Sequence, residues 1–274
     1  MDDPWPYPSL YPQVIMINFT TGCDPEIFVA DAHGPRSVIG KVGGTKHEPL
    51  PLPIGDGFAV QEDNVALEFC IPPAKNKAEF INFVKQATGY LEKEVCSVYN
   101  WKWDKRSAIS FPEQELDDPR AFVFGCDPDF SAWTGRANPR PSAKDKALRS
   151  AGGHVHIGCA HLNVDIISVV KACDLFLGVP SILMDNGTER RKLYGKAGAF
   201  RPKQYGVEYR TLSNFWIFED KYVSWVHDGV SRALEAVLIG MNIDVERTNI
   251  LSAINKSNKT IAEGLVAKYN LDVV

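Results

Sequence analysis

The chain has 274 residues, of which 45% are hydrophobic and 23% are charged, and its formal net charge is −4. Such a balance is typical of a globular protein with a sizeable core, and it lacks the basic surplus of a dedicated nucleic-acid binder. The sequence contains no signal segment and no run of about 18 apolar residues, so we expect a soluble, cytoplasmic protein without membrane contact. The six cysteines form no Cys-x-x-Cys pair, which indicates reduced, buried thiols.

Residues 1–15 hold four prolines among aromatic residues, a composition that denies regular structure. We therefore predict an N-terminal arm, followed by a single catalytic domain over residues 16–274. The segment Gly22–Phe28 reads Gly-Cys-Asp-Pro-Glu-Ile-Phe, with Asp24 and Glu26 two positions apart. An extended strand directs both carboxylates to one face, where they repel each other unless a cation or a proton offsets them.

Glycines, a threonine and a lysine stand together at Gly43–Lys46, ahead of a proline-rich stretch that ends at Gly57. Their order is not that of a phosphate-binding P-loop, in which Gly-Lys-Ser/Thr opens a helix. We expect a flexible substrate loop here.

Residues 58–72 are predicted to form one strand, with room for a bulge. Glu62, Asn64 and Glu68 share parity along it and would face the same side. A solvated strand face is the alternative, but apolar residues flank Glu68 and favour its burial. Helical spacing then runs from Lys75 to Tyr99, and Asn76 with Glu79 predicts a capping box at its start.

The opening motif returns at Gly125–Phe130, where Asp127 and Asp129 take the places of Asp24 and Glu26. Such a recurrence indicates a repeated strand–turn feature, in which one copy would bind metal and the other substrate. The sequence leaves open which copy does which.

His154 and His156 lie in a short strand framed by glycines and share one face of it. Two histidines at this spacing predict a metal or phosphate contact, and zinc hydrolases also use such pairs. A core helix is expected over residues 163–184, with Asn163 as its N-cap. Residues 219–274 are expected to form two packing helices without chemistry, at 220–241 and 245–269.

The segment 189–213 is rich in basic residues. Near its end, Glu208 and Arg210 share one face of a strand. A surface ion pair would explain these two residues alone. A cationic, glycine-bearing loop followed by Glu-x-Arg is better suited to a polyphosphate and its metal.

Asp-Pro-Glu, a glutamate-bearing strand, His-x-His and Glu-x-Arg follow one another in this order over residues 16–216. This series resembles the glutamine synthetase-like carboxylate–amine ligases, in particular the phage-type amidoligases (COOH–NH2 ligase type 2). The resemblance implies an α+β fold, namely a single domain with a curved, mainly antiparallel sheet covered by helices on one face. It also implies ATP and Mg²⁺ as cofactors, with Mn²⁺ as the alternative metal.

By this resemblance, five residues are expected to bind metal: Asp24, Glu26, Glu68, His154 and Glu208. Six are expected to contact the nucleotide: His156, Arg191, Lys192, Lys196, Arg201 and Arg210. Arg201 and Arg210 would also stabilise the transferring phosphoryl group, and Glu62 or Asp63 would accept the amine's proton.

The implied reaction joins a small-molecule or peptide carboxylate to an amine through an acyl phosphate, in the host cytoplasm if a phage encodes the protein. Three other interpretations stay open: a metal-dependent phosphotransferase on the same fold, a His-x-His metallohydrolase that needs no ATP, and a binding protein with a decayed site. A homo-oligomer is also left open.

Overall fold

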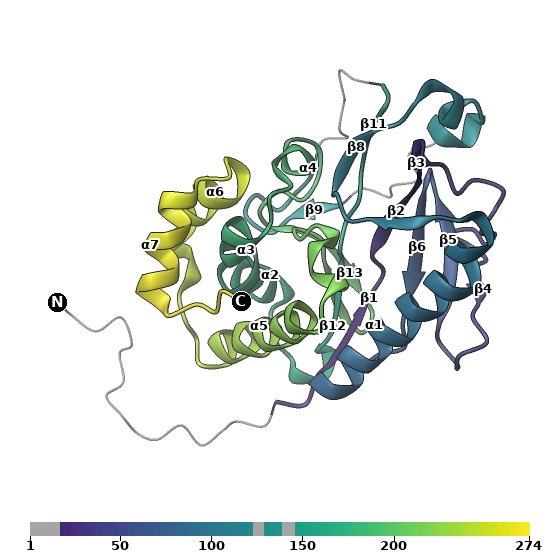
Figure 1. Ribbon diagram of the computed structural model, residues 1–274. Helices are drawn as coiled ribbons and strands as arrows, with labels where there is room; N and C mark the ends of the chain where they lie inside the picture. The colour runs from purple at the N-terminus through teal and green to yellow at the C-terminus, as the bar shows by residue number, and fades with distance from the viewer. Residues whose placement is uncertain (1–16, 123–128, 139–145) are drawn as a thin grey trace.

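The computed structural model describes residues 17–122, 129–138 and 146–274 (Figure 1). The predicted arm and residues 125–128 of the second Gly-Cys-Asp-Pro copy lie outside these ranges.

Two six-stranded sheets, both antiparallel in all their pairings, form the frame of the described chain. The first, sheet A, runs in the spatial order β1 (Thr20–Cys23), β12 (Val155–Gly158), β14 (Gly206–Tyr209), β13 (Ala199–Lys203), β9 (Phe130–Ser131) and β10 (Arg136–Ala137). The second, sheet B, contains β3 (Gly34–Arg36), β2 (Glu26–Asp31), β6 (Ala66–Cys70), β5 (Ala59–Asp63) and β4 (Leu50–Pro51), with β7 (Lys102–Asp104) also paired to β2. A separate pair joins β8 (Ala108–Ser110) to β11 (Leu148–Ser150).

The chain passes from sheet A to sheet B at Asp24 and Pro25, which lie between β1 and β2. Proline has no backbone N–H to donate to a sheet ladder, so it suits this break. The sequence predicted that Asp24 and Glu26 share one continuous strand, which is wrong. Asp24 lies in the junction, and Glu26 is the first residue of β2.

Residues 58–72 form a hairpin, so the prediction of one strand is wrong. The turn follows Asp63, where Asn64 adopts a left-handed backbone (φ 55°), a conformation that asparagine tolerates. The register places Gln61 opposite Glu68 and Glu62 opposite Leu67. Because side chains alternate along a strand, Asp63 shares the face of Glu68 and Glu62 points to the other face.

Helix α1 (Lys77–Leu91) begins where the sequence predicted, with the Asn76 side chain accepting a hydrogen bond from the Glu79 amide. Glu79 in turn accepts from the amide of Lys75, one residue before the expected partner. A π-helical turn (Glu92–Cys96) and a 3₁₀ turn (Ser97–Tyr99) continue it to the predicted end. Phe83 of α1 packs edge-on against Phe58, so the helix covers one face of sheet B.

The predicted helix over 163–184 is present as α2 (Ile166–Cys173), a π-helical turn (Asp174–Gly178) and α3 (Val179–Met184). Its cap is Asp165 and not Asn163, which has a φ of 52° and ends the preceding 3₁₀ turn (Ala160–Leu162). This helical stretch is long and apolar enough to cross a membrane, but 72% of its most apolar window is buried inside the protein. That burial is the behaviour of a core helix.

Helices α5 (Asp220–Leu238), α6 (Arg247–Asn255) and α7 (Lys259–Tyr269) complete the helical layer, with α4 (Thr188–Leu193) beside them. The predicted helix over 245–269 is wrong, because the chain turns at Ser257 (φ 49°) and Asn258 caps a new helix. Shorter 3₁₀ turns lie at Glu113–Leu116, Pro119–Phe122, Asn214–Phe218 and Ile243–Glu246.

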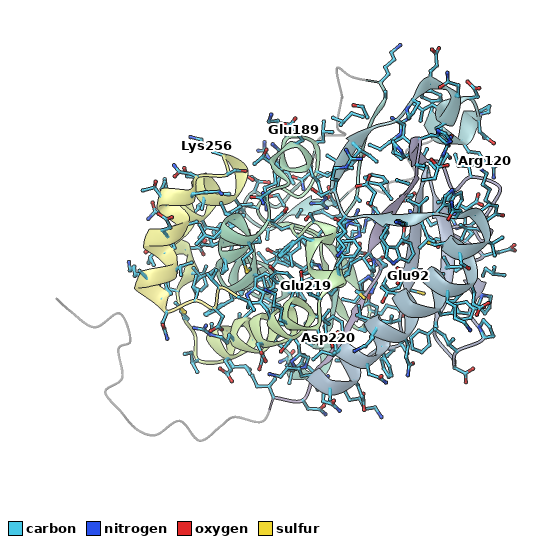
Figure 2. All side chains as sticks on the ribbon, viewed as in Figure 1. Glu92, Arg120, Glu189, Glu219, Asp220 and Lys256 are labelled. Atoms are coloured by element: carbon cyan, nitrogen blue, oxygen red, sulfur yellow. The ribbon has the colours of Figure 1, made fainter. Side chains whose placement is uncertain are left out.

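Helix α2 packs on β14 and β13, and α5 packs on both α2 and α1. The helices thus cover one side of the sheets, and charged residues such as Glu92, Glu219 and Lys256 are exposed on this layer (Figure 2). An α+β architecture with a curled antiparallel sheet is confirmed.

Candidate active site

Three acids on neighbouring strands of sheet B form what we call the carboxylate cluster: Glu26 on β2, Asp63 on β5 and Glu68 on β6. One oxygen of each lies within 4.8 Å of an oxygen of the other two. Glu26 is directly opposite Glu68 in the register, which fixes both side chains on the same face. Glu26 also accepts a 2.6 Å hydrogen bond from the amide of Gly152.

The carboxylate cluster carries more negative charge than its surroundings offset. Burial, reinforced by Asp63, raises the pKa of Glu26 to about 7. Burial and the charges of neighbouring acids raise the pKa of Glu68 well above its ordinary value. Burial raises the pKa of Asp63 as well. A divalent cation at this position would supply the missing positive charge.

A second group, which we call the histidine cluster, lies on sheet A and consists of Asp24, His154, His156 and Glu208. The register sets His156 opposite Glu208, and one donor atom each of Asp24, His156 and Glu208 lie within 4.8 Å of one another. Oδ1 of Asp24 is 3.0 Å from Nε2 of His156 and 3.4 Å from Nδ1 of His154.

Cations of the protein compensate the histidine cluster. Glu208 is fully buried and accepts a hydrogen bond from Arg210, and its Oε2 is 2.9 Å from Nζ of Lys203. Burial and Asp24 raise the pKa of Glu208, but Arg210 and the two histidines hold it below its ordinary value. Burial raises the pKa of Asp24, yet His156 and His154 hold it well below the usual range.

The pKa values of the two histidines are shifted in opposite directions. Burial and then Arg210 lower the pKa of His154 to about 4, so its ring is neutral near pH 7 and able to bind a metal. Burial lowers the pKa of His156, but Asp24 raises it above its ordinary value overall. The hydroxyl of Tyr205 is 2.8 Å from Nδ1 of His156, and the two rings stack.

Close packing around Gly152 explains the glycines that frame the histidine strand. A Cβ at Gly152 would collide with the His154 ring and come within 2.8 Å of the Arg190 guanidinium. Arg190 is buried and donates hydrogen bonds to the backbone carbonyls of Thr211 and Arg210. Burial lowers the pKa of Arg190 to about 10, so the side chain remains a cation next to Glu26 near neutral pH.

Some residues that the sequence predicted as nucleotide contacts lie beside the histidine cluster, and others contact neighbouring residues of the chain. Arg201 faces Glu208 across the β13–β14 pair, with 3.7 Å between Nη1 and Oε1. Arg191 is buried against Asp185 (2.8 Å), and Lys192 is exposed and paired with Glu189 (2.5 Å). Lys196 is half-buried, and its carbonyl accepts a hydrogen bond from Thr211.

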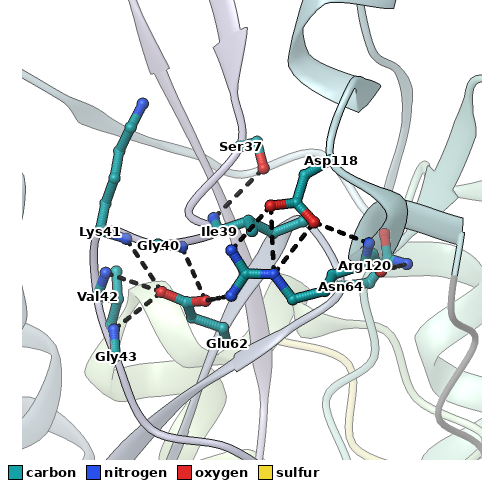
Figure 3. A network of polar contacts seen from close by, with 10 residues as sticks. All are labelled: Ser37, Ile39, Gly40, Lys41, Val42, Gly43, Glu62, Asn64, Asp118 and Arg120. Carbon is teal, nitrogen blue, oxygen red and sulfur yellow. Dashed lines mark hydrogen bonds and ion pairs between the residues drawn. The ribbon is translucent and has the colours of Figure 1, made fainter.

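Glu62 does not join the carboxylate cluster, which corrects its predicted place as a base at the site (Figure 3). Its carboxylate accepts hydrogen bonds from the backbone amides of Gly40, Lys41, Val42 and Gly43, at 2.9–3.1 Å. It also lies 3.3 Å from Arg120. Asp63, which the sequence offered as the other candidate, occupies the cluster in its place.

One described residue of the second Gly-Cys-Asp-Pro copy reaches the site. Oδ2 of Asp129 is 3.7 Å from Nε of Arg210, the residue that also binds Glu208. The first copy therefore contributes Asp24 and Glu26 to the two clusters, and the second contributes an acid to the arginine between them. Asp127 lies outside the described residues.

Besides the predicted residues, the structure brings Arg190, Lys203 and Tyr205 to the site, and it gives Asp63 a place in the carboxylate cluster that the sequence did not predict. Lys203 was detectable in the sequence, since it has the same parity as Arg201 on a short strand. Asp63 follows only from the hairpin register, and Tyr205 lies in the β13–β14 turn, where strand periodicity ends.

Residues 146–228 match the family model described as phage phiEco32-like COOH.NH2 ligase, type 2. This match supports the predicted family over the segment that it covers. The matched segment holds β12, β13 and β14, and with them both histidines, Glu208 and Arg210. None of the curated proteins compared with the chain matches it.

The match supports an enzyme of the carboxylate–amine ligase type. The donor sets suit such a ligase. The carboxylate cluster offers oxygen ligands only, which Mg²⁺ and Mn²⁺ prefer, and burial raises the pKa of Glu26 and of Glu68. The histidine cluster adds imidazole, which favours the softer of these two metals.

Proposed function

We propose that this protein joins a carboxylate to an amine at the expense of ATP, with Mg²⁺ or Mn²⁺ bound by the two clusters. The observation that carries the proposal is the uncompensated carboxylate cluster next to the cation-rich strands β13 and β14. Buried carboxylates, which favour a bound cation, thus lie next to basic side chains, which favour a bound anion. That combination suits a divalent metal together with a polyphosphate.

The divalent metal would be held by Glu26, Glu68 and Asp63 in one cluster and by Asp24, His154, His156 and Glu208 in the other. When bound, it would offset the charge of the phosphates and of the carboxylate that approaches them. An antiparallel sheet that presents acids and histidines from several strands supports this proposal, since it places the donor atoms close together.

In the first step, a carboxylate oxygen of the substrate attacks the γ-phosphorus of ATP, the bond to the β–γ bridging oxygen breaks and ADP leaves. Arg201 and Arg210 would stabilise the transferring phosphoryl group, since both guanidinium groups already lie beside Glu208 on this face. Arg190 anchors Arg210 through its backbone carbonyl and adds positive charge near Glu26.

In the second step, the amine attacks the acyl carbon, the bond from this carbon to the phosphate oxygen breaks and inorganic phosphate leaves. The amine must lose a proton to form the neutral amide. The side chain of Asp63 faces the site, and the carboxylate oxygen that it does not give to the metal would accept this proton. Glu62, bound to four backbone amides, would not.

The proposed reaction is tested by measuring ADP release with Mn²⁺, a panel of small-molecule and peptide carboxylates, and hydroxylamine as a general amine. A ligase releases ADP and forms a hydroxamate only when carboxylate and hydroxylamine are both present. ADP release with a stable phosphorylated product and no amine would instead support the phosphotransferase. Hydrolysis of amides without ATP would support the metallohydrolase. We place the enzyme in the cytoplasm, where ATP is available.

A further inference from the structure

We propose that Asp129 binds the amine substrate, and that this substrate is a primary amine that arrives as a cation. This inference rests on the proposed function, because it names the chemical class of the second substrate of the same site. Three observations carry it: the face of sheet A on which Asp129 lies, a carboxylate without a hydrogen bond in the described chain, and a buried N–H of Arg210 beside it that has no acceptor there.

The strand pairing of sheet A places Asp129 on the face that carries the histidine cluster. Phe130 of β9 is opposite Phe200, the residue before Arg201 on β13. Asp129, one residue earlier along the chain, is therefore beside Arg201 and on the other face from Phe130. Its Oδ2 is 3.7 Å from Nε of Arg210, which lies on this face too. Asp129 thus reaches the two arginines that would stabilise the transferring phosphoryl group.

Asp129 differs from the other acids that the described chain brings to the site, because its carboxylate has no close partner. Asp24 and Glu208 are compensated inside the histidine cluster, and the carboxylate cluster is the proposed metal site. The side chain of Asp129 accepts no hydrogen bond from a described residue, since its 3.7 Å contact with Arg210 is longer than one. It is also 19% exposed, against 8% for Arg210, so a substrate can approach it.

Arg210 contributes an unmatched donor to the same place. Its Nε is buried and has no hydrogen-bond partner in the described chain. Its Nη1 donates to Glu208 and lies 3.3 Å from Nδ1 of His154, so the side chain is held in place without Asp129. A buried N–H without an acceptor destabilises the protein, and an oxygen of the bound phosphoryl group would satisfy it. Arg210 would therefore bind the anion, and Asp129 would be left for the other substrate.

Charge decides which substrate Asp129 would bind. A carboxylate repels ATP and the substrate carboxylate, whereas a primary amine is a cation near neutral pH and forms a charge-assisted hydrogen bond with it. An amine held by Asp129 would lie beside the phosphoryl group that Arg210 stabilises, and hence close to the acyl carbon that it attacks.

The proton balance of the second step also requires such a group. The bound ammonium has no lone pair, so it gives one proton to Asp129 before the attack. The nitrogen then attacks the acyl carbon, phosphate leaves, and the second proton goes to Asp63 as described above. The exposed side of the Asp129 carboxyl returns its proton to water.

The test compares cationic amines (methylamine, glycinamide and lysine) with hydroxylamine, which is uncharged near neutral pH, in the ADP-release assay described above. We expect Asp129→Asn to raise the KM of the cationic amines about tenfold and to change the KM of hydroxylamine and of ATP by less than about twofold. Asp129→Glu keeps the charge and should restore most of the preference for cations, and Asp129→Ala replaces the Asn variant if that variant does not fold. Asp31→Asn is the matched control, because Asp31 has a similar exposure (20%) and an arginine partner, Arg36, outside both clusters.

A second arm needs no turnover. Thermal midpoints of the Mn²⁺-loaded protein are measured against the chloride salts of the same cationic amines, with sodium chloride at equal ionic strength as the reference. The amines should stabilise the wild type, Asp129→Glu and Asp31→Asn, and they should not stabilise Asp129→Asn.

The two arms separate the inference from the proposed function. If wild type turns over and Asp129→Asn keeps its KM for cationic amines, the inference is wrong and the proposed function stands. An equal loss with charged and uncharged amines also overturns the inference, because Asp129 would then only support Arg210. If wild type releases no ADP but cationic amines stabilise it and not Asp129→Asn, the proposed function is wrong and the amine site stands. Wild-type protein that neither uses nor binds a cationic amine overturns the inference.

Discussion

Glu26 on β2 and Glu68 on β6 lie directly opposite each other, and Asp63 completes a triangle of acids with them. Like charges at paired positions destabilise a sheet, and burial makes the repulsion stronger. The fold can hold these residues only with a bound proton or a bound cation. Stability and metal binding are therefore linked at this site, and the first two predictions follow from that linkage.

The metal-free protein should lose stability as the pH rises from 5 to 8. A carboxyl whose pKa is raised in the folded state stabilises the fold fully below its unfolded pKa, and this contribution is lost as the pH rises through the folded pKa. The folded pKa of Glu26 is about 7, and Asp63 and Glu68 are shifted in the same direction. We expect a loss on the order of 2–3 kcal/mol in chemical denaturation of chelator-treated protein.

Saturating Mn²⁺ should remove most of this pH dependence, because the metal replaces the protons. The same pH titration of stability in metal-free buffer provides the control. A metal-free protein that is equally stable at pH 5 and pH 8 would show that the cluster is compensated by other groups.

The same substitution should have opposite effects on stability in the two clusters. Glu68→Gln removes one of three mutually repelling acids and should stabilise the metal-free protein at pH 8 by about 1 kcal/mol. Glu208→Gln removes the acid that Arg210, Lys203 and Arg201 share, so it should destabilise the protein by about 3 kcal/mol. Both variants should abolish the proposed ATP turnover, since each removes a residue that we propose as a metal ligand.

Urea denaturation of the two variants at pH 8, with and without Mn²⁺, measures this contrast. Glu68→Gln should also lose the stabilisation by Mn²⁺ at its cluster. If Glu68→Gln is less stable than wild type without metal, the repulsion inferred from the geometry is absent. If Glu208→Gln retains wild-type ATP turnover, the metal-site proposal is wrong.

Local patterns in the sequence were enough to find much of the site. Alternation along short strands predicted one shared face for His154 and His156 and one for Glu208 and Arg210, and the register then pairs His156 with Glu208. The N-cap at Asn76 and the core helix behind β14 also follow from local signals. These features depend on residues a few positions apart, where period and capping determine the geometry.

The carboxylate cluster depends on long-range pairing that no local pattern contains. Asn64 turns the chain without a neighbouring glycine, so residues 58–72 lack the usual hairpin signal. Without that turn, parity along a single strand puts Glu62 on the face of Glu68, whereas in the hairpin Asp63 shares that face. The change of sheet at Pro25 also separates Asp24 from Glu26. The strand before it pairs with β12 and the strand after it pairs with β6, and no local pattern predicts these partners.

Tyr205→Phe should weaken metal binding at the histidine cluster. Nε2 of His156 must carry no proton to bind a metal, so Nδ1 carries it and donates to the Tyr205 oxygen at 2.8 Å. Loss of this hydroxyl removes the group that orients the ring, and we expect about a tenfold loss of Mn²⁺ affinity. Electron paramagnetic resonance of bound Mn²⁺ measures it, with two classes of site in the wild type.

Tyr99→Phe is the matched control, since that hydroxyl donates to the Lys41 carbonyl on the surface. It should leave both Mn²⁺ affinities unchanged. Equal affinities for Tyr205→Phe and wild type would mean that His156 is not oriented through Nδ1.

Glu62→Ala should release the loop that carries Lys46 without unfolding the protein. Four backbone amides lose their acceptor at once, and each becomes free to bond with water only if the loop opens. Trypsin cleaves after Lys41 and Lys46, so we expect cleavage at these two positions to become at least tenfold faster than in wild type. Mass spectrometry of the fragments identifies the sites.

Arg120→Ala separates this effect from the loss of an ion pair. It removes the 3.3 Å contact with Glu62 but keeps all four amide bonds, and an exposed pair of this kind contributes little to stability. Cleavage of Arg120→Ala should therefore remain close to the wild-type rate. Faster cleavage throughout the chain, and not at the loop, would mean that Glu62 stabilises the whole fold and does not hold this loop specifically.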